Sequence, residues 1–183
     1  RLDDFEQIRA RVPVLAALHQ PIKMNLEMLD AWCRITASHP QSLLWLAHSD
    51  PRARERLRSQ ATTCGLDPAR LIFTEREPDR ARYLARWRLA DLMLDSYPYG
   101  GHSTVGEALA VGCPVLTRCG RSIPSRVAGS MLHQLGLDDL ITNDLPSYEA
   151  RARELLADPE RLAELRAPCG AAAQRLAADR SRH

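Results

Sequence analysis

The sequence predicts an α/β fold in which a parallel sheet of about six strands is covered by helices on both faces, with two further helices at the carboxyl end. Short apolar runs alternate along the chain with amphipathic stretches of helical periodicity, which is the pattern of successive βαβ units. The apolar runs are continuous, as expected of strands that are buried on both faces. The length of 183 residues suits one domain, so we expect residues 1–183 to form a single unit.

The first half of the chain carries three strand–helix pairs. Strands are predicted at residues 12–18, 42–47 and 70–74, and helices at residues 25–37, 51–64 and 79–88. The side chain of Asn25 can cap the first helix, and Gly65 can end the second. Tyr83, Leu84 and Trp87 form the apolar side of the third helix.

The second half continues the alternation. Strands are predicted at residues 91–95, 114–117 and 140–142, and helices at residues 103–111, 122–135, 147–157 and 159–178. The fourth strand runs into a loop rich in Pro and Gly, and the helix after this loop stops at Gly112. Ligands of a parallel sheet bind at the carboxyl ends of its strands. The edge of interest is therefore formed by the loops that follow Leu18, Thr74, Asp95 and Thr117.

Composition and charge argue against several classes of protein. A net charge of +2 gives no signal for nucleic acid, and no apolar run approaches the roughly 20 residues that a membrane span needs. The five cysteines form no CxxC pair, so we expect no metal site and free thiols in a reducing cytoplasm. The first residues include neither a starting Met nor the apolar region of a signal peptide, so a fragment of a longer cytoplasmic chain is expected.

One feature of the composition concerns a single residue. Of the 25 basic residues, only Lys23 is a lysine, and all the others are arginines. The bias toward arginine fits a GC-rich coding background, and a surface lysine that survived by chance is one interpretation of Lys23. The other is functional, because an ammonium is a compact point charge that fits where a planar guanidinium cannot.

The loop after the fourth strand is a candidate anion site. Gly100 and Gly101 allow close approach of a ligand, and His102, Ser103 and Thr104 place side-chain donors and amides at a helix start. We expect no side-chain carboxylate to intrude, so the loop suits a diphosphate. Glu107 lies one turn further on, where its carboxylate could accept a hydrogen bond from a ribose hydroxyl. A plain Gly-rich turn with an ordinary helix cap is the alternative.

Two other loops offer partners for such a ligand. Gln20 and Lys23 follow the first strand, and the ammonium could neutralise a departing phosphate; a solvated lysine at a helix start is the alternative. After the third strand, a base could stack on Tyr83 with Arg80 at its polar edge, although packing of Tyr83 on Trp87 is also expected of a helix. The remaining histidines show no metal-ligand spacing and are expected to be structural or exposed, and the arginine clusters at 52–58 and 80–88 to be solvated helix faces.

Taken together, these segments resemble the C-terminal catalytic half of the protein O-GlcNAc transferases, the family that includes the plant SPINDLY proteins and bacterial relatives. The resemblance covers the chain from about His19 to Leu140. It rests on the order and spacing of the segments HQPIKM, SLLWL, GLDPARLIF, RLADLMLDSYPYGGHSTVGEAL, GCPVLT and SRVAGSML.

The resemblance implies a fold, an activity and partners. It implies the Rossmann-like C-terminal half of a two-domain GT-B glycosyltransferase, which binds a UDP-sugar, most simply UDP-GlcNAc, as the donor substrate. The sugar would be transferred with inversion and without a metal or other cofactor to Ser/Thr hydroxyls of proteins. The protein acceptor would be held by an upstream domain and tetratricopeptide-like (TPR) repeats, with no nucleic acid partner and no membrane span.

The same resemblance assigns roles to individual residues. It makes Lys23 the catalytic residue that supports departure of UDP, with Gln20 near the diphosphate. His102, Ser103 and Thr104 would hold the phosphates. The expected donor-binding set also contains Glu107 at the ribose, Tyr83 and Arg80 at the base, and Pro78 and Gly101 in the two loops.

The sequence departs from the family pattern at three places. Glu107 stands where an Asp is usual, Gly100 where an Asn is usual, and residues 118–123 replace a Pro-Gly-Glu-Thr loop near the donor sugar. The departure at residues 118–123 leaves the sugar open. Together with Gly100 it also keeps the alternative of a degenerate module that serves as a protein-interaction domain. A second alternative is an enzyme similar to a sugar-nucleotide epimerase, which also uses GT-B halves; it would need carboxylates at the sugar, and the candidates Glu75 and Glu77 in the edge loops look misplaced for that.

Overall fold

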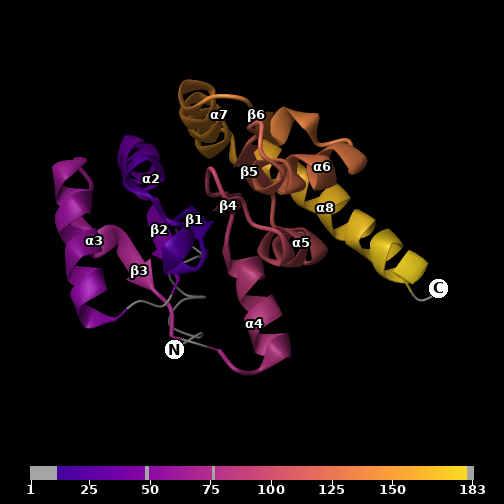
Figure 1. The fold of residues 1–183 in the computed structure, drawn as a ribbon, viewed down its shortest axis with the longest axis horizontal. Coiled ribbons are helices and arrows are strands. Elements are labelled where there is room, and N and C mark those ends of the chain that lie inside the picture. Colours follow the sequence, from indigo (N-terminus) through magenta and orange to yellow (C-terminus); the bar gives the residue numbers. More distant parts are fainter. Residues whose placement is uncertain (1–11, 48–49, 76, 181–183) are drawn as a thin grey trace.

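The computed structural model describes residues 12–47, 50–75 and 77–180, which form a parallel sheet flanked by helices (Figure 1). The strands are β1 (Val14–Ala17), β2 (Leu43–Leu46), β3 (Leu71–Phe73), β4 (Leu92–Leu94), β5 (Val115–Arg118) and β6 (Ile141–Thr142). The α-helices are α2 (Leu26–Ser38), α3 (Pro51–Thr63), α4 (Arg80–Arg86), α5 (Ser103–Ala110), α6 (Val127–Gln134), α7 (Leu145–Ala157) and α8 (Pro159–Arg180). Short 3₁₀ helices are η1 (Pro21–Lys23), η2 (Pro68–Arg70), η3 (Trp87–Leu89), η4 (Ile123–Ser125) and η5 (Asp138–Leu140).

All the strands of the sheet run parallel, in the order β3-β2-β1-β4-β5-β6. Leu15 of β1 pairs with Leu44 of β2 on one side and with Leu92 of β4 on the other. The chain leaves β1 toward β2 and returns to the opposite side of β1 as β4, so the strand order reverses between β1 and β4. Ligands of open α/β sheets bind in the crevice that such a reversal creates at the carboxyl ends of the strands.

The helices cover both faces of the sheet, as the sequence predicts. α2 contacts α3 and α7, whereas α5 contacts α6 and α8. Between these layers lies a continuous apolar core, whose largest fully buried side chains are Trp32, Trp45, Trp87 and Tyr148. Among the described residues no helix is both long and apolar enough to cross a membrane.

Helix boundaries follow local chemistry that is visible in the sequence. Asn25 caps α2 through a hydrogen bond from the Met28 amide, as expected. Glycines with positive φ follow α3, α5 and α6, namely Gly65 (77°), Gly112 (84°) and Gly136 (68°), which is the left-handed conformation that ends a helix.

The helix predicted over residues 122–135 is wrong in its first third. Residues 123–125 form η4, and α6 begins only at Val127. Pro124 has no amide proton to donate, and Ser125 turns its hydroxyl to the carbonyl of Ser122 at 2.7 Å. The predicted helix 79–88 also tightens at its end, because α4 stops at Arg86 and η3 follows.

The C-terminal helices are bonded to the sheet rather than appended to it. The hydroxyl of Tyr148 on α7 donates to the carbonyl oxygen of Asp95 at 3.0 Å, and it accepts from the indole nitrogen of Trp32 at 3.2 Å. On α8, Arg166 pairs with Asp91 at 3.0 Å. These contacts connect both C-terminal helices to the segment that contains β4.

Candidate functional site

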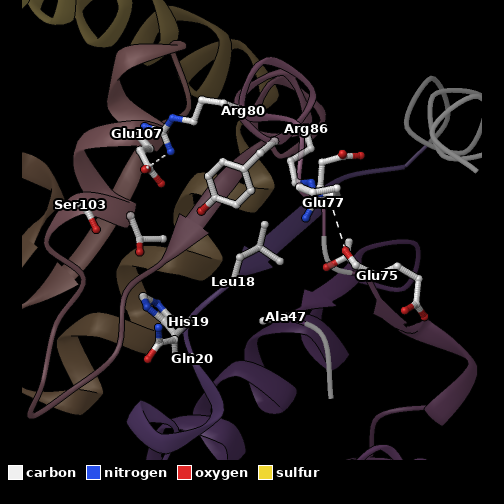
Figure 2. A pocket seen from close by; sticks show the side chains of 14 residues that line it. Leu18, His19, Gln20, Ala47, Glu75, Glu77, Arg80, Arg86, Ser103 and Glu107 are labelled. Carbon is white, nitrogen blue, oxygen red and sulfur yellow. Dashed lines mark hydrogen bonds and ion pairs between the residues drawn. The ribbon is translucent and has the colours of Figure 1, made fainter. Parts of the chain in front are cut away.

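A cavity of about 530 Å³ opens at the carboxyl end of the sheet (Figure 2). Its walls come from the segments after β1, β2 and β3, from α4 and from the start of α5. The lining residues are Leu18, His19, Gln20, Ala47, Thr74, Glu75, Glu77, Pro78, Arg80, Tyr83, Arg86, Ser103, Thr104 and Glu107. The predicted edge of the sheet is therefore the edge at which this cavity lies, although the segment after β5 does not line it.

The start of α5 is built differently from most other helix starts in the chain. Helices α2, α3, α4 and α7 are capped by the side chains of Asn25, Asp50, Asp79 and Asp144. At α5 the N-cap residue is His102, and no side chain accepts from the first amides. The amides of Ser103 and Thr104 have no hydrogen-bond partner among the described residues, and both residues line the cavity. Free amides at a helix start attract an anion.

The expectation that no carboxylate intrudes on this loop is wrong. Asp95 is 1% exposed and directly follows β4, and its carboxylate accepts from the amide of Gly101 at 2.7 Å and from the hydroxyl of Thr117 at 2.7 Å. The Gly101 amide is therefore occupied inside the protein and is not a free donor for a ligand. A Cβ at Gly101 would approach Asp95 Oδ1 to 3.3 Å and Val105 Cγ2 to 2.9 Å, so this close packing requires glycine.

His19 is a buried residue of the site that the sequence analysis left among the structural or exposed histidines. Its Nε2 lies 3.0 Å from the carbonyl oxygen of Leu94 and 3.8 Å from Asp95, and its ring stacks on Trp32. Because a carbonyl can only accept, Nε2 carries the proton. Burial lowers the pKa of His19 below its ordinary value and outweighs the opposing effect of the Asp95 carboxylate. The ring is therefore neutral near pH 7.

Lys23 lies beside the cavity and next to the anion loop. Its Nζ is 3.4 Å from the carbonyl oxygen of Gly100 and 4.3 Å from the ring centroid of Tyr99. The ring of Tyr99 in turn stacks on His102, with centroids 5.4 Å apart. The structure thus brings Lys23 and His102 together around one tyrosine, although neither side chain lines the cavity itself.

The ammonium of Lys23 differs from the arginines in its partners. Within the described ranges, its contacts are the Gly100 carbonyl and the Tyr99 ring, and no carboxylate pairs with it. Carboxylates do pair with Arg34, Arg54, Arg80, Arg118, Arg151, Arg153, Arg161 and Arg166. The charge of Lys23 therefore remains available to an anionic ligand.

Across the cavity, Arg80 on α4 pairs with Glu107 on α5, with Nη1 and Oε1 2.5 Å apart (Figure 2). Tyr83 lies between the guanidinium groups of Arg80 and Arg86, at 5.6 and 5.5 Å from its ring centroid. Burial and the neighbouring Glu107 carboxylate raise the pKa of Tyr83 above its ordinary value. An aromatic face, a carboxylate and a cation thus converge at this end of the cavity.

The remaining predicted site residues fall into two groups. Gln20 and Pro78 line the cavity and are exposed, whereas Gly101 is buried within the loop and does not line the cavity. Arg86, which the sequence analysis assigned to a solvated face, is 9% exposed and lines the cavity. Burial lowers the pKa of Arg86, and its guanidinium donates to the carbonyl of Glu75.

The loop after β3 was predicted to lie at this edge, and Thr74, Glu75 and Glu77 do line the cavity. Ala47, which follows β2, was not predicted to line it; its position after a predicted strand is the signal that could have found it. Among the described residues, no group of His, Cys, Asp and Glu is arranged to hold a metal ion.

Comparison with known proteins gives consistent matches. The model of glycosyl transferase family 41 matches residues 10–177. A UDP-N-acetylglucosamine–peptide N-acetylglucosaminyltransferase of Caenorhabditis elegans is 33% identical over 154 residues, which is 84% of this chain and 13% of that protein. The probable enzyme SEC of Arabidopsis thaliana, described by the same activity, is 33% identical over 83% of this chain and 16% of its own length.

Solved structures agree with these sequence matches. A mutant of the Thermobaculum terrenum O-GlcNAc transferase superposes with a TM-score of 0.84 and 30% identity, covering 89% of this chain and 32% of that one. The described chain therefore has the Rossmann-like architecture of GT-B glycosyltransferases, as the sequence predicts. It spans a minor part of the length of each of these relatives.

Proposed function

Because the chain belongs to glycosyl transferase family 41, we propose that it is the donor-binding half of an enzyme that transfers GlcNAc from UDP-GlcNAc to Ser/Thr hydroxyls of proteins. The observation that supports this best is the uncapped start of α5, which opens into the cavity beside a lysine without a carboxylate partner. The names of the relatives, which are UDP-N-acetylglucosamine–peptide transferases, supply the sugar and the kind of acceptor.

In the proposed complex, the diphosphate of the donor rests on the amides of Ser103 and Thr104. An acceptor hydroxyl attacks the anomeric carbon and loses its proton to water, the bond from that carbon to the β-phosphate oxygen breaks, and the bonding electrons leave with UDP. Negative charge therefore grows on the β-phosphate, where the Lys23 ammonium stabilises it. A single displacement inverts the anomeric centre. The ammonium and the helix amides take the part that a divalent cation plays in other sites, so the proposed reaction uses no metal.

The nucleoside is proposed to occupy the cavity between α4 and α5. Uracil stacks on Tyr83 with Arg80 and Pro78 beside it, and Glu107 accepts from the ribose. Aromatic–base stacking is worth about 1–3 kcal/mol, so Tyr83 would contribute strongly to affinity. Gln20, which is exposed at the mouth of the cavity, lies within the same set and would donate toward the diphosphate.

The test is UDP binding measured by calorimetry on the 183-residue chain. Wild type should bind, and Lys23→Ala should bind about tenfold more weakly, because a hydrogen bond to a charged group contributes about 1.5–3 kcal/mol. Arg88→Ala removes the same charge from an exposed position on η3 and should leave affinity unchanged. Absence of UDP binding by the wild type would contradict the proposal.

Transfer itself is measured on the complete protein with UDP-GlcNAc and a Ser/Thr peptide. Lys23→Ala should lower turnover more than it weakens UDP binding, because the charge on the leaving phosphate is greatest in the transition state. Analysis of the sugar-nucleotide pool separates transfer from epimerisation: transfer releases UDP, whereas epimerisation returns a new UDP-sugar. UDP binding without either product would favour the non-catalytic alternative.

A further inference from the structure

Tyr99 is the residue that connects the sole lysine to the anion loop. Its ring centroid lies 4.3 Å from Lys23 Nζ and 5.4 Å from the imidazole centroid of His102, with the two rings 19° from parallel. The side chain is 45% exposed, so burial in the core does not explain its presence. No role was assigned to it from the sequence.

The contact of Lys23 with the Gly100 carbonyl restrains the ammonium only weakly. A lysine side chain has four rotatable methylene groups, and an unrestrained ammonium samples many positions. The distance of 3.4 Å from Nζ to the Gly100 carbonyl oxygen is at the long limit for a hydrogen bond. The Tyr99 ring, in contrast, lies within the distance at which a cation is attracted to an aromatic face.

The kind of restraint matters because the charge of Lys23 has to remain available. A carboxylate would hold the ammonium and also cancel its charge toward a phosphate. An aromatic face attracts a cation through its quadrupole and carries no net charge. Arg118, the last residue of β5, provides the contrast: it stacks at 3.9 Å on Tyr97, which lies in the same loop as Tyr99, and it also pairs with Glu27 at 3.4 Å, so its charge is neutralised.

We propose that Tyr99 is a positioning residue that holds the Lys23 ammonium at the anion loop through a cation–π contact, while leaving its full charge for the diphosphate of the donor. This inference rests on the proposed function for its purpose, but the contact itself can be tested without any ligand. The relevant ligand chemistry is a nucleoside diphosphate, for which UDP is the probe.

The single lysine of the chain makes the contact directly observable by NMR. Protein labelled with ¹³C-lysine gives one set of side-chain methylene signals, which belong to Lys23. Protons held over the face of an aromatic ring are shielded by its ring current, so the terminal methylene protons should resonate upfield of those of free lysine. UDP is then titrated into the same sample, and the shift of the Lys23 signals reports binding.

Two variants and one control distinguish the effect of the Tyr99 ring from a general effect on folding. Tyr99→Phe keeps the ring and should retain the upfield shift and the UDP affinity. Tyr99→Leu keeps an apolar side chain without a ring; it should abolish the upfield shift and weaken UDP binding about fivefold, within the range of a cation–π contact. Ile22→Ala alters the 90% exposed neighbour of Lys23 and should change neither readout. Thermal unfolding of each variant checks that the fold is retained.

The outcomes distinguish the two proposals. If wild type binds UDP but its Lys23 signals lack the upfield shift, or if Tyr99→Leu binds UDP as tightly as Tyr99→Phe, the positioning role of Tyr99 is wrong while the proposed function stands. If the upfield shift is present but UDP moves no Lys23 signal, the proposed function fails and the role given to Tyr99 fails with it. The inference is supported if Tyr99→Leu loses the upfield shift and binds UDP more weakly, whereas Tyr99→Phe and Ile22→Ala retain both properties.

Discussion

The carboxylate of Asp95 accepts a hydrogen bond from the backbone amide of Gly101 at 2.7 Å, six positions further along the chain. The same carboxylate accepts from the Ser96 amide at 2.9 Å and from the hydroxyl of Thr117 on β5 at 2.7 Å. One buried side chain therefore closes the loop between β4 and α5 and joins that loop to the neighbouring strand. The position of the α5 start depends on this contact.

Asp95→Asn tests this dependence. An amide side chain can accept through its oxygen, but its NH₂ group then faces one of the donors that the carboxylate satisfied. Hydrogen bonds to a charged group contribute about 1.5–3 kcal/mol, so the free energy of unfolding should fall by about 2–3 kcal/mol in urea denaturation. Thr117→Val removes only one of the bonds to the carboxylate and should cost about 1.5 kcal/mol, at the lower end of that range. Equal costs for the two variants would contradict the central role of Asp95.

Two glycines of the α5 region provide a matched pair. At Gly101 a Cβ would approach Val105, Asp95 and His19, the nearest atom at 2.9 Å, whereas at Gly106 it would meet no atom within 4 Å. Gly101→Ala should lower stability by about 1–3 kcal/mol through overpacking and should weaken UDP binding. Gly106→Ala lies inside α5 and should raise stability by up to about 1 kcal/mol. Urea denaturation measures stability and calorimetry measures UDP binding. If both variants were destabilised to the same extent, the close packing around Gly101 would not explain the loss.

Because His19 is buried as a neutral imidazole, we expect the free energy of unfolding to fall at acidic pH. Its folded-state pKa lies below the ordinary value of 6.5, because burial penalises the imidazolium. As the pH falls below about 6.5, the unfolded state therefore binds a proton before the folded state does, and the free energy of unfolding decreases. The contribution is fully present above pH 6.5. Urea denaturation of the wild type across this window should show the loss, and His19→Gln should reduce the slope.

His133 serves as the control for this titration. The hydrogen bond that the His133 ring donates to the Asp138 carboxylate raises the pKa of His133 above its ordinary value of 6.5, so the stability that this pair contributes is present below pH 6.5 and is lost as the pH rises. His133→Gln should therefore leave the slope below pH 6.5 unchanged. If His133→Gln reduces the dependence of the free energy of unfolding on pH below 6.5 and His19→Gln does not, the effect belongs to His133 and the prediction for His19 is wrong.

Glu107 should discriminate between nucleotides with different ribose groups, if the proposed function holds. Comparison of UDP with 2′-deoxy-UDP by calorimetry measures the contribution of one ribose hydroxyl. Glu107→Ala should lower the preference for UDP by about fivefold, because it removes an acceptor whose hydrogen bond contributes about 1 kcal/mol. Glu164→Ala removes an exposed carboxylate that pairs with Arg161 on α8 and should preserve the preference. An unchanged preference in Glu107→Ala would place the ribose elsewhere.

The order of strands and helices was predictable because it depends on local pattern. Continuous apolar runs mark the strands, and Asn25 and Gly65 mark helix ends through interactions within one turn. The structure shortens every predicted strand except the fifth, which keeps its length and shifts by one residue to Val115–Arg118, since pairing with neighbours rather than apolarity decides where a ladder ends. The predicted helix 122–135 contains Pro124, which is tolerated only near a helix start, so the sequence indicated a start near this residue but not the separate turn of η4 that precedes α6.

The internal organisation of the site was not predictable in the same way. Pattern placed Lys23, His102 and Tyr83 at one edge, because all three lie after or near strand ends of a parallel sheet. It could not show that Tyr99 would contact Lys23 across 76 positions of sequence, or that Glu107 would pair with Arg80 before any ligand arrives. Asp95 was visible as a carboxylate at a strand end. Its role depends on a loop that folds back, which no local periodicity describes.

The hydrogen bonds of Tyr148 have a consequence for engineering. Its hydroxyl accepts from the indole of Trp32 and donates to the carbonyl oxygen of Asp95. Helix α7 therefore helps to hold the start of the loop between β4 and α5, although α7 contributes no residue to the cavity lining. A chimaera that grafts this sheet onto another acceptor-binding half would have to carry α7 along with the strands. A graft boundary placed before Leu145 would deprive the Asp95 carbonyl of its donor and would disturb the loop without altering a single residue that faces the cavity.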